Sequence, residues 1–220
     1  LNSYLRQGAL VDPAFVEAAS HLAPAVVRVG GISADWLLYQ PSGSGGGARR
    51  PAGDSYWPTA PENISFAELD TLIGFMNATG LRLLLDLNEL NGRNCQTTNP
   101  TTKQPDWCVG SWDTSNVRAL LQHLHDEGVV GGASSLFGFE LGNELVTHLP
   151  ATANTADILT LSEMVSSIWA DAPGGPPPVY APSTDDCETP DTAAIMRNVT
   201  GAVAGFTYHA YPGGNGATIA

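Results

Sequence analysis

Leu136-Phe137-Gly138-Phe139-Glu140-Leu141, followed at once by Gly142-Asn143-Glu144, is the stretch that decides the fold. A short, largely apolar run of this kind, bounded by a glycine, is typical of a strand buried in a parallel sheet. Polar side chains that follow such a strand lie at the carboxyl edge of the sheet, where barrel enzymes hold their catalytic groups. We therefore predict a parallel strand that places Asn143 and Glu144 at an active face.

On both sides of this stretch, helical and strand patterns alternate. Strands are predicted at Ala25–Val29, Leu81–Asn88, Leu136–Leu141, Val179–Ala181 and Gly205–His209. Helices are predicted over Val11–Leu22, from Ser65 to Gly80, from Asp113 or Thr114 to Gly128, from Thr155 to Pro173, and from Pro190 onward. Capping residues open most of these helices, and glycine or proline closes them. This alternation predicts βα units around a parallel sheet.

About five strands are too few for a closed (β/α)8 barrel, so we predict an incomplete TIM barrel. Residues 1–220 would form one partial barrel domain with open sheet edges, which is not expected to be a stable enzyme by itself. A doubly wound sheet is disfavoured because no Gly-x-Gly-x-x-Gly or P-loop follows the first strand. The glycine-rich stretch at about 40–54 is predicted to be a flexible surface insertion and not a domain boundary.

Composition excludes some functions. The net charge is −13 with nine Lys and Arg, which argues against a nucleic-acid partner. No apolar run reaches the roughly 18 residues of a membrane span, and the N-terminus lacks the pattern of a signal peptide. Sequons at Asn63, Asn77 and Asn198 favour a secreted glycoprotein, and membrane-associated, lysosomal or vacuolar locations stay open.

The three cysteines are an odd number. Cys95 and Cys108 flank a polar stretch. This pattern favours a disulfide that closes a surface loop, and it disfavours a metal site. Cys187 is then either a free thiol or the partner of a cysteine in sequence not shown. The histidines show no paired metal-binding spacing, since His123 and His125 lie on different helix faces, so neither a metal nor another cofactor is predicted.

Phe139-Glu140-Leu141-Gly142-Asn143-Glu144 resembles the strand-four motif of heparanase and its plant and microbial β-glucuronidase relatives, whose final glutamate is the proton donor. Similar segments occur in the same order at Val27–Gly31 with Asp35 following, at Thr79–Leu90 and at Thr207–Tyr211. The resemblance runs from about Leu5 to Tyr211. Gly-Asn-Glu by itself occurs across the wider clan of barrel glycosidases.

The resemblance implies that Glu144 is the catalytic acid/base. Asn143 would bond the 2-hydroxyl of the reacting sugar, and His209 with Tyr211 would line the subsite and orient the nucleophile. The residues that would bind substrate are Asn143, His209, Tyr211, Asn88 and Gly31. Two departures, Ile32 in place of a threonine and Ala210 in place of a second histidine, put fine substrate contacts in doubt.

Retaining hydrolysis needs two carboxylates about 5 to 5.5 Å apart. In the family the nucleophile is a glutamate beyond the His-x-Tyr motif, and this chain stops before it. The remaining carboxylates near strand ends are expected to line the barrel or cap helices: Asp86, Glu89, Glu140 and Asp185.

The resemblance therefore implies a retaining, heparanase-like β-glucuronidase without a cofactor. Its partners would be a saccharide or glucuronide substrate and the remaining C-terminal part of the same protein. The alternatives are another glycosidase of the barrel clan and a non-catalytic carbohydrate-binding fragment. Four tryptophans are candidates for stacking on sugar rings: Trp36, Trp57, Trp107 and Trp112. At least two of them are expected to be packing residues instead.

Overall fold

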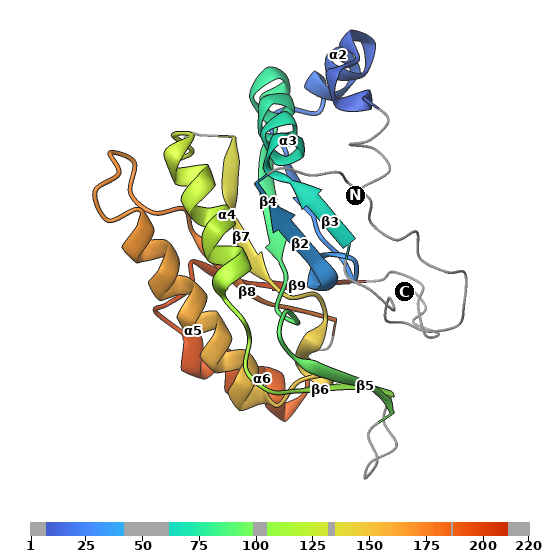
Figure 1. The fold of residues 1–220 in the computed structure, drawn as a ribbon, viewed down its shortest axis with the longest axis vertical. Coiled ribbons are helices and arrows are strands. Elements are labelled where there is room, and N and C mark those ends of the chain that lie inside the picture. The colour runs from blue at the N-terminus through green and yellow to red at the C-terminus, as the bar shows by residue number, and fades with distance from the viewer. Residues whose placement is uncertain (1–7, 42–61, 99–104, 132–134, 186, 211–220) are drawn as a thin grey trace, which may run out of the picture.

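The centre of the molecule is a sheet of five parallel strands in the order β1-β4-β7-β8-β9 (Figure 1). The computed structural model describes residues 8–41, 62–98, 105–131, 135–185 and 187–210. The strands of the sheet are β1 (Val26–Val29), β4 (Arg82–Leu87), β7 (Leu136–Leu141), β8 (Val179–Thr184) and β9 (Gly205–Tyr208). The five predicted strands are all present, and β8 extends beyond its predicted end.

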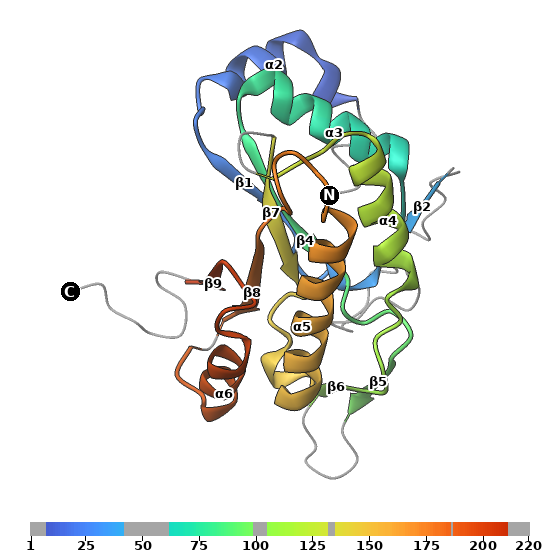
Figure 2. The ribbon, with the colours of Figure 1, turned by 90° about the vertical axis from the view of Figure 1, so that its left-hand side faces the viewer.

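Helices connect the strands and wrap around the outside of the curved sheet (Figures 1 and 2). They are η1 (Ala9–Val11), α2 (Pro13–Ser20), η2 (Ala34–Trp36), α3 (Phe66–Thr79), α4 (Ser115–Asp126), η3 (Leu145–Thr147), α5 (Ala151–Ile168) and α6 (Pro190–Val199). Helices α4, α5 and α6 pack one against the next. The described part is thus an α/β half-barrel, as the alternation of patterns predicts.

Local capping explains where several helices begin. At the start of α3, the Ser65 amide donates to Glu68 at 2.8 Å and the Glu68 amide donates to Ser65 Oγ at 3.2 Å, which completes a capping box. At α4, Asp113 and not Thr114 accepts the free amide, from Ser115 at 3.0 Å. These ends are encoded within a few residues, so the sequence could predict them.

Helix α5 begins at Ala151, one turn before the predicted start at Thr155, so that prediction is wrong at its first turn. The additional turn carries Asn154, which is 1% exposed and donates from Nδ2 to both oxygens of Glu89 at 3.0 and 2.9 Å. Glu89 follows strand β4, far away in the sequence. A tertiary contact therefore stabilises this turn, and local pattern could not reveal it.

The two faces of the sheet differ in chemistry. Leu83, Leu85 and Leu87 of β4 are buried against the helices, and Trp169 at the end of α5 packs into the same core. Because side chains alternate along a strand, Asp86 points to the opposite, inner face. The inner face is polar and forms the base of the candidate site.

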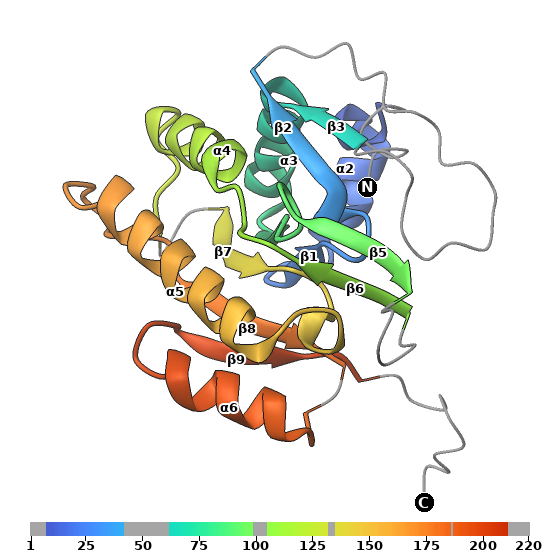
Figure 3. The ribbon, with the colours of Figure 1, turned by 60° about the horizontal axis from the view of Figure 1, so that its bottom comes forward.

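Two smaller sheets accompany the barrel strands (Figure 3). Strands β2 (Leu37–Gln40) and β3 (Glu62–Ser65) pair in parallel, whereas β5 (Asn94–Thr98) and β6 (Pro105–Val109) form an antiparallel hairpin. The sequence predicted a polar loop where this hairpin lies. Of the predicted glycine-rich insertion, Gln40 closes β2, and residues 42–54 lie outside the described residues.

Both outer strands of the sheet expose apolar side chains. Val26 of β1 is 45% exposed, and Phe206 and Tyr208 of β9 are 42% and 65% exposed. On the outer side of each of these strands, the described part of the chain contributes no further strand. The sheet edges are therefore open, as expected for part of a barrel.

Candidate active site

Two strained turns meet at the carboxyl edge of the sheet. Glu144, just after β7, has φ 57°, and Ser183, near the end of β8, has φ 51°. Positive φ is unfavourable for residues other than glycine and costs about 1–3 kcal/mol, so it persists where the surroundings enforce it, often at functional sites. Here the Glu144 amide donates to the Ser183 carbonyl at 2.8 Å. This bond fixes the position from which the Glu144 side chain extends.

His209 brings the end of β9 to the same point. Its amide donates to the Thr184 carbonyl at 2.7 Å, which anchors the residue at the edge of β8. Its Nδ1 lies 2.5 Å from Glu144 Oε1, and its Nε2 lies 3.3 Å from Ser183 Oγ. The side chains of Glu144 and His209 are 13% and 15% exposed. Three successive strands thus converge on one partly accessible carboxyl group.

Arg28 of β1 connects the remaining strands beneath this carboxyl group. Its Nη2 donates to Asp86 Oδ2 at 3.1 Å, to Asn143 Oδ1 at 3.1 Å and to Ser183 Oγ at 2.8 Å. Its Nε donates to Glu140. A single guanidinium therefore ties together β1, β4, β7 and β8, and it orients the amide of Asn143.

Carboxyl groups outnumber cations on this inner face. Burial raises the pKa of Asp86 to about 7, with Arg28 opposing the rise and Glu140 adding to it. Burial and the nearby charge of Asp86 raise the pKa of Asp35 well above its usual range. Protons are therefore retained in this cluster at pH values where exposed aspartates are ionised.

The loop after β1 closes over these groups. Asp35 Oδ1 accepts a hydrogen bond from the Asn143 amide at 3.1 Å, and the Gly31 amide donates to Asp86 Oδ2 at 3.2 Å. A Cβ at Gly30 would lie 2.5 Å from the Asp86 Cβ, so only glycine fits there. Gly31 thus contacts Asp86 through its backbone.

A second buried acid supports the loop after β4. Burial and the adjacent Asp157 raise the pKa of Glu89 well above its usual range. Arg93 pairs with Asp157, and Asn154 donates to Glu89 as described above. This network joins the loop to α5, and Glu89, which is 0% exposed, has a structural role there. Asp185, in contrast, is exposed beyond β8.

The other residues predicted to contact substrate lie in different parts of the fold. Asn88 is completely buried, and its Nδ2 donates to the Leu37 carbonyl, which holds β2 against β4. Tyr211 lies outside the described residues. Of the tryptophans, Trp112 is buried in the core and Trp36 is half-buried, whereas Trp57 and the side chain of Trp107 also lie outside the description.

The cysteines and sequons lie away from this cluster. Cys95 and Cys108 are bonded across the β5–β6 hairpin with an S–S distance of 2.01 Å, and Cys187 is an exposed free thiol. Asn77 and Asn198 are exposed, whereas Asn63 is half-buried and accepts a hydrogen bond from Gln40 at 3.1 Å. Two of the three sequons are therefore at the surface.

Sequence reasoning assigned no role to Arg28 or Ser183. For Arg28 a signal was present, because a charged residue inside a short apolar strand needs buried partners. Ser183 gave no signal, since its role depends on the packing of β8 between β7 and β9 and on its backbone conformation. Asp35 was noted only as part of a motif.

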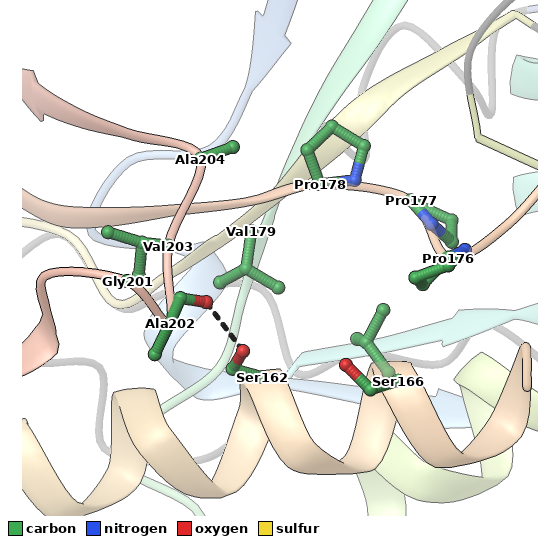
Figure 4. A pocket seen from close by; sticks show the side chains of 11 residues that line it. Ser162, Ser166, Pro176, Pro177, Pro178, Val179, Gly201, Ala202, Val203 and Ala204 are labelled. Carbon is green, nitrogen blue, oxygen red and sulfur yellow. Dashed lines mark hydrogen bonds between the residues drawn. The ribbon is translucent and has the colours of Figure 1, made fainter.

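A pocket of about 270 Å³ opens at the opposite, amino end of the sheet (Figure 4). Three prolines, Pro176 to Pro178, line it together with α5, and Ser162 Oγ donates to the Ala202 carbonyl at 2.5 Å across its floor. No carboxyl group lines this pocket. It has none of the acid chemistry found at the carboxyl edge.

Among the described residues there is neither a cluster suited to a metal ion nor a helix suited to span a membrane. Within them, no three His, Cys, Asp or Glu side chains converge as a metal site would require. Nor, along the same residues, does any helix combine the length and the apolar character that crossing a membrane demands.

The Glu144 carboxyl group, with His209 and Asn143 beside it, lies at the carboxyl edge of a curved parallel sheet, which is where barrel enzymes hold their catalytic groups. Residues 3–219 match the model of the glycosyl hydrolase family 79 N-terminal domain. The chain belongs to that family, which confirms the resemblance seen in the sequence. Among curated proteins, none matches the chain.

Solved structures share the fold. A 4-O-α-L-rhamnosyl-β-D-glucuronidase from Fusarium oxysporum 12S, in complex with Rha-GlcA, matches with a TM-score of 0.58 and 16% identity over 94% of this chain and 42% of that one. A family 44 xyloglucanase from Paenibacillus polymyxa matches with a TM-score of 0.53 and 14% identity over 84% of this chain and 48% of that one. The chain therefore spans less than half the length of these structures.

Proposed function

We propose that this chain supplies the acid/base half of a retaining β-glucuronidase of the heparanase kind. The observation that carries the proposal is the Glu144 carboxyl group, which is fixed by the Ser183 turn and bonded to His209 at the edge of the sheet. Membership of family 79 and the fold shared with a glucuronidase support the same activity. The nucleophile would come from a part of the protein outside these residues.

In the first step, Glu144 donates its proton to the glycosidic oxygen while the nucleophile attacks the anomeric carbon. In the second, Glu144 takes a proton from the water that releases the sugar. Asn143 Oδ1 is occupied by Arg28, so its Nδ2 is the group that donates to a hydroxyl of the reacting sugar. His209 orients the carboxyl group through its bond to Oε1.

The remaining part of the protein would also complete the barrel. A strand added at β1 or β9 would cover Val26, Phe206 and Tyr208 and satisfy the open backbone edges. We therefore include the rest of the same protein as the partner of this half-barrel.

The test replaces Glu144 by Gln in the full-length protein and compares an alkyl with a 4-nitrophenyl β-D-glucuronide. An acid/base role predicts a loss of about 10²- to 10⁴-fold on the alkyl glucuronide, while the nitrophenyl compound, which needs no protonation to leave, still gives a rapid first release. Glu163→Gln makes the same change at an exposed position of α5 and should behave as wild type. Equal losses on both substrates would refute the assignment.

Proton NMR of the first product tests the stereochemistry. A retaining enzyme releases the β-anomer first, whereas initial release of the α-anomer would refute the double displacement. Binding of saccharide without any turnover by the complete protein would instead support a carbohydrate-binding role.

A further inference from the structure

The turn Gly142-Asn143-Glu144, which carries the candidate acid, begins against the end of strand β4. The Gly142 amide donates a hydrogen bond to the carbonyl of Leu87, the last residue of β4, at 3.0 Å. Gly142 has φ 70°, a conformation that glycine adopts without strain. The position of Gly142 therefore helps to set where the next two residues, Asn143 and Glu144, lie.

The side chain of Glu89 packs directly against Gly142. A Cβ at Gly142 would lie 2.5 Å from Glu89 Oε2 and 3.3 Å from Glu89 Cβ, so a larger residue does not fit between them. Glu89 is 0% exposed. Any influence of Glu89 on the reaction therefore passes through the backbone of the turn and not through contact with a sugar.

Helix α5 holds the Glu89 carboxyl group from the other side. Asn154 Nδ2 donates to Oε1 and Oε2 at 3.0 and 2.9 Å, and Glu89 is also hydrogen-bonded to the Asp157 carboxyl group. Two ionised carboxylates only accept hydrogen bonds, so this bond requires a proton. Burial and the nearby Asp157 raise the pKa of Glu89, which makes Glu89 the donor. Glu89 is thus a neutral group of fixed length between α5 and the turn.

Arg93 completes the network. Its Nη2 pairs with Asp157, its Nε donates to the Glu89 carbonyl at 3.0 Å, and its Nη1 donates to the Gly110 carbonyl after β6. Arg93 supplies one positive charge for two buried carboxyl groups, so the second carboxyl group is stable there when it is neutral. Asp35 of η2 also faces Glu89, and its negative charge favours the same neutral form.

We propose that Glu89 is a positioning residue for the acid/base: its carboxyl group, held by α5, supports Gly142 and thereby fixes the turn that carries Glu144. The inference rests on the proposed function and deepens it by naming a residue away from the substrate on which the geometry of the acid depends.

This role requires the length of the Glu89 side chain and not its charge. Aspartate is one methylene shorter, so it would withdraw the carboxyl group from Gly142. Glutamine keeps the length, and its amide can accept from Asn154 and donate to Asp157. The two substitutions therefore separate support of the turn from an effect of the acid group itself.

The experiment measures kcat and KM of the full-length protein on an alkyl and on a 4-nitrophenyl β-D-glucuronide, together with the Tm of each variant. The variants are Glu89→Asp and Glu89→Gln. Glu163→Asp is the matched control, because it makes the same shortening at an exposed position of α5.

We expect Glu89→Asp to lower kcat on the alkyl glucuronide about ten- to one-hundredfold with an unchanged KM, because a displaced acid weakens binding of the transition state alone. The loss should be smaller on the nitrophenyl compound, which needs no protonation to leave. Glu89→Gln should retain most of the wild-type kcat, and Glu163→Asp should behave as wild type.

Three results would overturn the positioning role while leaving the proposed function intact. They are wild-type kcat in Glu89→Asp, an equal loss in Glu89→Gln, and a loss in Glu89→Asp that is the same on both substrates, which would indicate a purely structural role. Failure of the wild-type protein to cleave either glucuronide would refute the proposed function and the positioning role with it.

Asn154→Ala gives an answer that does not depend on the folding of Glu89→Asp. It removes both hydrogen bonds that α5 donates from Asn154 to Glu89. A lower kcat on the alkyl glucuronide, with a smaller loss on the nitrophenyl compound and an unchanged KM, would support the role. Wild-type kcat on both substrates would overturn it.

Discussion

Ser183→Ala is the most informative single change at the candidate active site. The substitution removes the hydroxyl that accepts from Arg28 at 2.8 Å and lies 3.3 Å from His209 Nε2. A hydrogen bond to a charged group contributes about 1.5–3 kcal/mol. Since about 1.4 kcal/mol corresponds to tenfold in rate, kcat/KM should fall about ten- to one-hundredfold if the bond serves the transition state.

The assay compares alkyl and 4-nitrophenyl β-D-glucuronides with the full-length protein. If the hydroxyl acts by holding His209 against Glu144, the loss should be larger on the alkyl compound, whose departure depends on protonation. A loss that is the same on both substrates would mean that the hydroxyl does not act through the acid.

Ser183→Gly separates the hydroxyl from the backbone. Glycine adopts φ 51° without strain, so this variant should be more stable than Ser183→Ala while it lacks the same hydroxyl. We expect equal activity losses for the two variants and a higher Tm for the glycine variant. Wild-type activity in Ser183→Gly would refute the argument and assign the effect to backbone strain.

Three further predictions concern stability, each measured by thermal unfolding of the full-length protein. Burial raises the folded-state pKa of Asp86 to about 7, so the stability that this residue contributes is fully present below about pH 4 and is lost as pH rises through 7. Tm should therefore fall between about pH 4 and 7, less steeply in Asp86→Asn, and an unchanged slope would contradict this. Ser65→Ala removes the capping box of α3 and should cost about 1 kcal/mol, whereas an unaltered Tm would show that the cap is dispensable. Gly30→Ala should be strongly destabilising, because its methyl group would lie 2.5 Å from the Asp86 Cβ; a Tm within 1–2 °C of wild type, roughly 0.5 kcal/mol or less, would show that the loop adapts.

Much of the fold could be predicted because its signals are local. The capping box at Ser65, the proline that opens α6 and the apolar run of β7 each act within a few residues, and the corresponding elements are present. The start of α5 was wrong because its first turn depends on Glu89. The β5–β6 hairpin was missed because its polar residues lack the alternation that marks a half-buried strand.

The candidate site was predictable only in part. Glu144 and Asn143 follow an apolar strand, so the sequence predicts their place at the carboxyl edge of the sheet. The role of Asn88 could not be foreseen, because it depends on where β2 packs. Its Nδ2 donates to the Leu37 carbonyl of β2, and its Oδ1 has no hydrogen-bond partner among the described residues.

By itself, the sequence determined the order of the five strands of the main sheet and of helices α2 to α6, the family, and which acid follows the central strand, because periodicity, caps and motifs are properties of neighbouring residues. The tertiary structure decided which groups meet. His209 bonds Glu144 across 65 residues, and Arg28 reaches Asn143 across 115 and Ser183 across 155. Those contacts depend on strand order and on how the inner face of the sheet closes, because the half-buried Arg28 guanidinium meets Asp86, Glu140 and Ser183 only when β1, β4, β7 and β8 lie side by side.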